Sequence, residues 1–136
     1  MKPWVKVAGY PGNNAVNPAF RKTIMHADIF DLNTPSFKGP AQAVINEYAV
    51  FNASVNHLRA ATPGSGAYIN EADVLEPDWQ QSFFGDNYQK LLAIKKKRDP
   101  WGLFWAPSTV GSEGWEVVGT HGLPTQNGQL CRTNSS

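Results

Sequence analysis

The longest regular pattern in the chain is a stripe of apolar residues between Pro40 and Pro63. Apolar side chains recur there every three or four residues, which predicts an amphipathic helix of roughly 20 residues, about 30 Å long. Pro40 suits the first turn of this helix, and Pro63 with Gly64 ends it. A helix of this length needs a surface to cover, such as a sheet. The stripe consists of Ala41, Val44, Ile45, Tyr48, Phe51, Val55 and Leu58.

Shorter elements are expected on both sides of this helix. Residues 21–32 alternate loosely between apolar and polar side chains, and alternation with a period of two is typical of a strand. Asp86 is placed to cap a second helix, which Asp99-Pro100 ends because the residue before a proline is pushed out of the helical region. The full set of expected elements is strands over residues 21–32, 66–70 and 115–118, a helical turn over residues 78–84 and a helix over residues 87–98.

The expected fold class is α+β, with antiparallel strands covered by helices. So few strands do not make a self-contained sheet, because a two-stranded sheet is marginally stable unless further strands join it. The five Trp and seven Phe residues also need a surface to bury against. The chain is therefore expected to be one part of a larger fold.

The balance of charges argues against two classes of partner. The formal net charge is +1, so neither nucleic acid nor an anionic membrane is expected to bind. The basic run Lys95–Arg98 is interpreted as a helix C-terminus, where cations complement the helix dipole. No run approaches ~18 apolar residues, so no membrane span is expected.

Cysteine usage and the first residues are also informative. Cys131 is the only cysteine, so no disulfide within the chain is expected. Pro3, Gly9 and Pro11 interrupt the first residues, and no apolar run of ~7–15 residues follows, which argues against a signal peptide.

Familiar site patterns are not met. The run GSGAYI, residues 64–69, begins like a dinucleotide fingerprint, but the third glycine and the following helix are missing. His26, His57 and His121 stand far apart in the sequence without a neighbour at metal-ligand spacing, so no metal site is expected. The carboxylates of residues 71–78 are interpreted as a solvated acidic loop.

Tyr68 and Asn70 differ in kind, because they share one face of the expected strand. Residues i and i+2 of a strand point to the same side, while Ala67 and Ile69 point to the other side and suit a core. A phenol beside an amide can deprotonate a substrate hydroxyl and hold a cofactor carbonyl. A tyrosine that acts as a base needs help from a nearby cation or an electron-poor flavin ring. By spacing alone, a polar strand face that meets water is the favoured interpretation.

From residue 67 onward, short motifs follow one another in a fixed order. The stretches AYINEAD and DWQQSFFGDNYQKLLAIKKKRDPWGLF contain a Tyr-x-Asn strand, a tryptophan, an aromatic-Gly-x-Asn-Tyr helix start, an Asp-Pro helix end and a phenylalanine. This order and spacing resemble the C-terminal, berberine-bridge-enzyme-like region of FAD-linked oxidases, which are of the vanillyl-alcohol-oxidase type. Upstream, AVNPAFRKTIMHADIF is similar to a segment that leads a substrate-domain strand in fungal members. The matching residues are Tyr68, Asn70, Trp79, Phe84, Gly85, Asn87, Tyr88, Leu91, Ile94, Lys95, Asp99, Pro100 and Phe104.

The resemblance, which covers about residues 13–118, implies an FAD-dependent oxidoreductase. Such a flavoprotein oxidase removes hydride from a small organic substrate and transfers it to the flavin. In this family pattern Tyr68 is the catalytic base and Asn70 is a cofactor-binding residue close to the isoalloxazine. Cys131 lies beyond the matching region and is not equated with a flavin-linking cysteine.

The resemblance also implies a domain organisation and a missing partner. FAD is expected to be bound mainly by an N-terminal domain that is not part of this chain. Family members are often secreted, but the sequence leaves the localisation open. The implied segments are the end of a substrate-binding domain over residues 1–62, a berberine-like region over residues 63–119 and a disordered tail over residues 120–136.

Two other functions stay open. The chain by itself is a catalytically silent fragment if no other part supplies the FAD domain. Alternatively, the chain is a non-enzymatic, aromatic-rich binding module, for example for carbohydrate. In that reading Trp101, Trp105 and Trp115 form a stacking platform.

Overall fold

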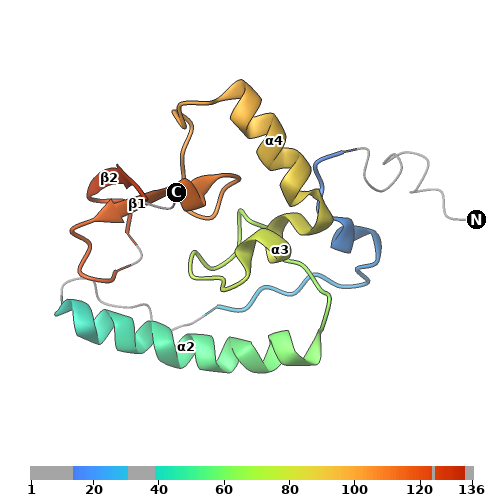
Figure 1. Cartoon of the computed structure of the whole chain (residues 1–136). Coiled ribbons are helices and arrows are strands. Elements are labelled where there is room, and N and C mark those ends of the chain that lie inside the picture. Colours follow the sequence, from blue (N-terminus) through green and yellow to red (C-terminus); the bar gives the residue numbers. More distant parts are fainter. Residues whose placement is uncertain (1–13, 31–38, 124, 134–136) are drawn as a thin grey trace, which may run out of the picture. The chain divides into compact units, whose positions relative to one another are not determined.

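The structure, a computed structural model, describes residues 14–30, 39–123 and 125–133 (Figure 1). The chain divides into two compact units. Among the described residues, the first unit comprises residues 14–25 and 66–113, and the second comprises residues 26–30, 39–65, 114–123 and 125–133. Helices accompany a two-stranded antiparallel sheet, which confirms the α+β class.

Short helices build the first unit, and a glycine separates the two longest of them. Gly85 has φ +54° and ψ −143°, a combination that only glycine adopts readily. The chain therefore changes direction there, and the helical turn and the second helix expected from the sequence are both confirmed. The helical elements are η1 (Pro18–Arg21), α3 (Trp79–Phe84), η2 (Gly85–Asn87) and α4 (Tyr88–Arg98), where η marks a 3-10 helix. A last 3-10 helix, η3 (Ser112–Gly114), begins in this unit and ends at the first residue of the next stretch.

Aromatic side chains form the core of the first unit. Phe83 and Tyr88 are buried, with 5% of each residue exposed. The ring of Trp79 stands edge-on to Tyr88, with 5.6 Å between centroids, and edge-on to Phe84 at 6.3 Å. Edge-to-face pairs of this kind add ~0.5–1.5 kcal/mol beyond the burial of their area. The rings hold α3 against the start of α4.

The second unit contains the long helix and the sheet. Helix α2 (Ala41–Ala61) confirms the helix predicted from the apolar stripe. Val44 in this stripe is 1% exposed, whereas Leu58 near the end of the helix is 46% exposed. The stripe is therefore buried more fully at its N-terminal end.

Strand β1 (Trp115–Val118) confirms the strand expected at these residues. It pairs antiparallel with β2 (Gln129–Arg132), and Trp115 lies opposite Arg132. The Arg132 guanidinium stands over the Trp115 ring, 4.6 Å from the centroid, an arrangement that typically contributes ~0.5–1 kcal/mol at an exposed site.

The two other expected strands are wrong. Residues 22–30 form no strand and their side chains are exposed throughout, while residues 31 and 32 lie outside the described residues. Residues 66–70 make one backbone hydrogen bond to a distant segment, from Ala67 N to Ser82 O at 2.8 Å, and then enter a turn. A strand needs a neighbouring strand to pair its backbone groups, and neither segment has one among the described residues.

Two smaller expectations also need correction. Asp86 does not cap α4, because it lies inside η2 and α4 begins after Asn87 without a side-chain cap hydrogen bond. Strand β2 lies within the tail expected to be disordered, because its backbone finds a partner in β1. The basic run Lys95–Arg98 does occupy the last turn of α4, which confirms its interpretation as a helix C-terminus. None of the helices in the described ranges has the length and apolar character that a bilayer crossing requires.

Candidate functional site

Tyr68 and Asn70 lie side by side, although their segment is not a strand. Nδ2 of Asn70 donates a hydrogen bond to the Tyr68 hydroxyl at 2.7 Å. Both residues are exposed, Tyr68 by 42%, while Ala67 and Ile69 are half-buried. The structure therefore brings together the two site residues expected from the sequence. Their side chains lie on the same side because of a turn, rather than because of the alternation of a strand.

Phe20 of η1 is the aromatic neighbour of Tyr68. The two rings lie edge to face, with 6.4 Å between centroids and 85° between planes, and Phe20 is 37% exposed. The phenol thus has an apolar ring on one side and the Asn70 amide at its hydroxyl. An N–H group donated to a phenolic oxygen stabilises negative charge on that oxygen. This arrangement presents a phenol and an amide together at the surface.

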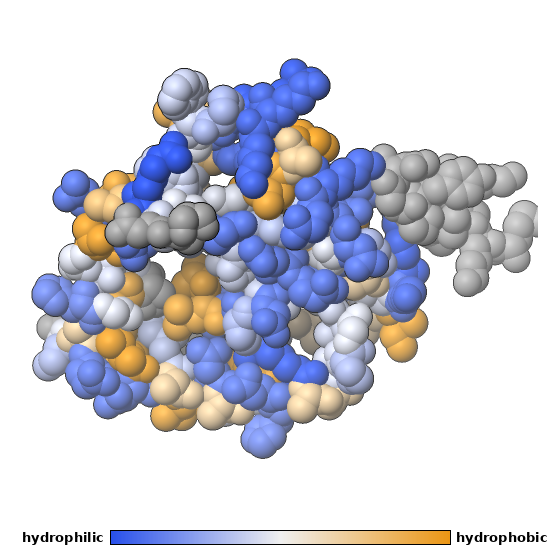
Figure 2. Space-filling model, viewed as in Figure 1, coloured by the Kyte–Doolittle hydropathy of each residue, from blue (hydrophilic) through white to orange (hydrophobic). Residues whose placement is uncertain are grey.

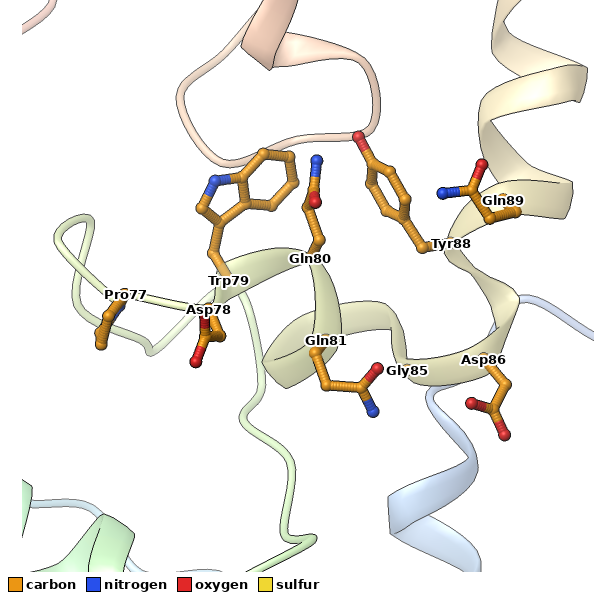
Figure 3. A pocket seen from close by; sticks show the side chains of 9 residues that line it. All are labelled: Pro77, Asp78, Trp79, Gln80, Gln81, Gly85, Asp86, Tyr88 and Gln89. Carbon is orange, nitrogen blue, oxygen red and sulfur yellow. The ribbon is translucent and has the colours of Figure 1, made fainter.

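A pocket of about 590 Å³ lies elsewhere in the first unit, around α3 and η2. Figure 3 shows Trp79, Gln80 and Tyr88 on one side of α3, with Gln80 between the two rings. The sequence motifs include Trp79 and Tyr88 but do not predict this pocket, because it depends on the change of direction at Gly85. Its lining consists of Pro77, Asp78, Trp79, Gln80, Gln81, Gly85, Asp86, Tyr88 and Gln89, so Tyr68 and Asn70 do not line it.

The Tyr88 hydroxyl is engaged at the edge of this pocket. It donates to Glu113 Oε1 at 2.6 Å and accepts from Gly111 N at 3.3 Å. Burial of the phenol, together with the Glu113 carboxylate at its hydroxyl, raises the pKa of Tyr88 to about 12. A phenol that holds its proton so firmly is unsuited to act as a base near neutral pH. Tyr88 instead links α4 to residues 111–113 through the hydrogen bonds of its hydroxyl.

The loop after α4 is held by hydrogen bonds and presents apolar side chains. Lys95 Nζ donates to Asp99 Oδ2 at 2.6 Å, and the Asp99 carboxylate accepts from the backbone of Leu103 at 2.8 Å and of Phe104 at 3.0 Å. The Lys95 hydrogen bond is the main cause that lowers the pKa of Asp99 to about 2. Yet Trp101, Leu103 and Phe104 are 77–79% exposed.

The tryptophans proposed as a platform have partners of their own. Trp105 Nε1 donates to Ser112 O at 3.3 Å, and Trp115 carries the Arg132 guanidinium on its ring. These contacts give Trp105 and Trp115 structural uses within their own units, so they do not favour a binding platform. His26, for which the sequence predicts no metal-ligating neighbour, lies close to Asp28. The distance between His26 Nε2 and Asp28 Oδ1 is 3.1 Å, and both side chains are about half exposed.

The sequence of this chain is similar to a known protein family and to several fungal proteins. Residues 67–111 match the family model described as berberine and berberine like. The chain is 38% identical to the FAD-linked oxidoreductase ZEB1 of Gibberella zeae, over 96% of the chain and 23% of that protein. It is 40% identical to the FAD-linked oxidoreductase sor8 of Hypocrea jecorina, over 89% of the chain and 20% of that protein. The chain thus spans about a fifth of the length of these fungal relatives.

A solved structure shows the same similarity. The crystal structure of the VAO-type flavoprotein MtVAO615 from Myceliophthora thermophila C1 matches with a TM-score of 0.52 and 40% identity. The match covers 65% of this chain and 16% of that one. Together with the family match, this confirms the resemblance stated from the motifs.

The described residues suit contact with part of an FAD molecule. Tyr68 and Asn70 present a phenol and an amide at the surface, hydrogen-bonded to each other, and such groups fit the polar edge of an isoalloxazine ring. A glycine-rich loop leading into a helix N-terminus, which would hold a pyrophosphate, is not found among the described residues. The described part of the chain therefore offers groups that fit the polar edge of the ring.

Proposed function

We propose, from the premise that this chain carries the berberine-like region of the VAO-type FAD-linked oxidoreductases, that it supplies the proton-accepting face of the substrate site in such an enzyme. The reaction class is oxidation of a small organic substrate that carries a hydroxyl group. FAD would be held mainly by a part of the protein outside the described residues, and it would be the group that accepts the hydride.

The hydrogen bond from Asn70 to the Tyr68 hydroxyl carries the proposal. Once its own phenolic proton has left to solvent through the exposed hydroxyl, Tyr68 would accept the proton of the substrate hydroxyl while the adjacent C–H bond releases its hydrogen as hydride. The Asn70 amide orients the Tyr68 hydroxyl through its hydrogen bond, and it would face the polar edge of the cofactor. Exposure of both side chains leaves them open to a substrate and a cofactor that are held by other residues.

Replacement of Tyr68 tests the base role in the full-length flavoprotein that contains this chain. A screen of small primary and secondary alcohols for H₂O₂ release first identifies a substrate. We then expect Tyr68→Phe to lower the rate constant of flavin reduction in anaerobic stopped-flow measurements by ~10²–10⁴-fold. The substrate dissociation constant is expected to change far less, because the phenyl ring stays in place. Tyr48→Phe, on α2, is the matched control. Equal reduction rates for Tyr68→Phe and the wild type would remove Tyr68 from the base role.

The silent-fragment alternative makes a separate prediction for the chain itself. The purified chain is mixed with FAD, passed over a gel-filtration column, and examined by visible absorption. A retained flavin band near one equivalent contradicts both a silent fragment and a cofactor held mainly elsewhere. Loss of the flavin is the outcome that both the silent fragment and a cofactor held mainly outside the described residues predict, so the kinetics of Tyr68→Phe separate these two.

A further inference from the structure

Asn17 is a buried polar residue outside the proposed reaction, with 4% of its surface exposed. Its Oδ1 accepts from Ala19 N at 3.0 Å, which caps η1. Its Nδ2 donates to Ser82 O at 2.7 Å, a residue 65 positions later in the sequence. One amide group therefore joins η1 to α3.

The carbonyl oxygen of Ser82 receives a second hydrogen bond, from Ala67 N at 2.8 Å. Ala67 directly precedes Tyr68. A single oxygen atom on α3 thus holds both the Asn17 amide and the backbone that carries the proposed base. Movement of the Asn17 amide changes the surroundings of that oxygen and hence of the Tyr68 segment.

Two glycines leave no spare room around the Asn17 amide. A Cβ atom at Gly66 would lie 2.7 Å from Asn17 Nδ2 and 2.9 Å from Ala19 Cβ, and a Cβ atom at Gly85 would lie 2.9 Å from Asn17 Oδ1. These separations are shorter than carbon approaches nonbonded atoms at van der Waals contact. The position of the amide is therefore set by packing as well as by hydrogen bonds.

The same junction places an aromatic ring beside Tyr68. The helix η1 that Asn17 caps carries Phe20, whose ring stands edge-on to Tyr68. A second buried amide, Asn87 Nδ2, holds the preceding backbone by donating to Val16 O at 2.9 Å. The η1 segment is thus held at two points, and Asn17 is the one that connects to the Tyr68 segment, through the Ser82 carbonyl.

We infer that Asn17 is a positioning residue for Tyr68 and Asn70. It acts through the Ser82 carbonyl and through Phe20, without touching the reacting atoms. Its effect on catalysis rests on the proposed function, whereas its effect on the position of the Tyr68 ring does not.

Asn17→Asp tests the position of the ring in the full chain. The substitution keeps an oxygen acceptor for Ala19 N, because Asp and Asn cap helices about equally well, but it replaces the donor to Ser82 O with an oxygen. In NMR spectra, with the ring signals assigned from Tyr68→Phe, we expect the Tyr68 ring resonances to shift and the Phe20–Tyr68 NOE to be lost. We also expect amide exchange at Ala67 to accelerate at least ~10-fold, since its hydrogen bond weakens. Wild-type ring shifts with a retained NOE would overturn the inference.

Gly66→Ala provides a second variant in which the Asn17 amide is chemically intact but displaced. The same shift of the Tyr68 ring signals is expected. If Asn17→Asp fails to fold, Gly66→Ala decides between an altered and an unchanged Tyr68 environment, and unfolding of both variants overturns the inference in favour of a purely structural residue. Asn46→Asp, an exposed site on α2 that accepts a hydrogen bond from Gln42, is the matched control and should leave the Tyr68 signals unchanged.

Kinetics of the full-length flavoprotein separate the positioning role from the base role. Asn17→Asp is expected to slow flavin reduction at least ~10-fold while the substrate dissociation constant stays within about twofold. In the double variant with Tyr68→Phe, Asn17→Asp should add no further loss, because residues that act as a unit are not additive. An additive loss would contradict action through Tyr68. If neither Asn17→Asp nor Tyr68→Phe slows flavin reduction while the NMR changes of Asn17→Asp are present, the proposed function fails. The effect of Asn17 on the position of the Tyr68 ring then stands.

Discussion

The hydroxyl of Tyr88 joins α4 to Glu113 and Gly111 inside the aromatic core. Its raised pKa of about 12 means that the folded state keeps the phenol protonated after the unfolded state, with a pKa near ~10, has begun to ionise. The stabilisation is fully present below about pH 10 and is lost as the pH rises through about 12. The free energy of unfolding falls with rising pH because the folded state binds this proton more tightly than the unfolded state does.

We therefore expect the free energy of unfolding to fall by about 2–3 kcal/mol between pH 10 and pH 12. Tyr88→Phe should abolish this part of the decline, and should itself cost roughly 1–2 kcal/mol at pH 7 because Glu113 and Gly111 lose a partner. Urea unfolding at a series of pH values measures both effects. Tyr48→Phe should keep the alkaline decline, and an unchanged decline in Tyr88→Phe would contradict the assignment.

Gly85 is a second residue whose replacement has a definite expected effect. Alanine is strained at φ +54° and ψ −143°, and its Cβ would also press on the Asn17 amide. We expect Gly85→Ala to lower the free energy of unfolding by roughly 1–3 kcal/mol or more, measured by urea unfolding. Gly114→Ala is the matched control, since a Cβ there meets no atom within 4 Å. Equal stability of the two variants would show that the turn at Gly85 tolerates a side chain.

At the scale of elements, the end of α4 is set by one carboxylate. Asp99 holds the backbone of Leu103 and Phe104 most strongly while it is ionised, and the Lys95 hydrogen bond lowers its pKa from the ordinary 3.8 to about 2. A carboxyl with a lowered pKa stabilises the fold above its ordinary pKa and loses that effect as the pH falls through the folded value. We expect the amide resonances of Leu103 and Phe104 to titrate with a midpoint near pH 2. Asp99→Asn should remove the transition and Asp86→Asn should not, while a midpoint near 4 would refute the assignment.

Helices were predictable from the sequence to a greater degree than strands. The periodic stripe of α2 and the Asp-Pro end of α4 act within a few residues, so local pattern was enough to place them. Residues 22–30 have strand-like alternation but no neighbour to pair with among the described residues, and pairing is a property of the whole fold. Conversely, β2 has little strand character in its sequence and exists because β1 lies opposite it.

The candidate site was predictable in part for the same reason. Tyr68 and Asn70 are two residues apart, so either a strand or a turn brings their side chains together. Asn17 could not be found this way, because its partner Ser82 is remote in sequence. The available signal was the Asn-Pro pair at residues 17 and 18, which indicates the start of a helix and says nothing about Ser82.

For the whole molecule, the described residues bury few hydrophobic side chains: Val44, Phe83 and Tyr88. Figure 2 shows orange hydrophobic surface between hydrophilic side chains on the face in view. Within the loop of residues 101–104, three large apolar side chains are exposed: Trp101, Leu103 and Phe104. Exposed apolar clusters of this kind promote association between molecules.

We expect the purified chain to self-associate through this loop at high concentration. Sedimentation velocity should show a smaller weight-average species for a triple variant with serine at Trp101, Leu103 and Phe104. Because these side chains are exposed, the variant should keep the far-UV circular dichroism of the wild type. A single Leu130→Ser substitution, at a less exposed residue on β2, serves as the control. Identical sedimentation of the triple variant and the wild type would exclude the loop.

The hydrogen bond from Asn17 to Ser82 can form only after residue 82 has been synthesised. The two residues are 65 positions apart, and closing a long loop costs entropy that only later contacts repay. A ribosome makes Asn17 first and Tyr68 and Asn70 well afterwards, yet the carbonyl to which Asn17 and Ala67 both donate emerges after all of them. A nascent chain that stops short of residue 82 therefore contains every group proposed for proton transfer and lacks the carbonyl that joins their segment to Asn17.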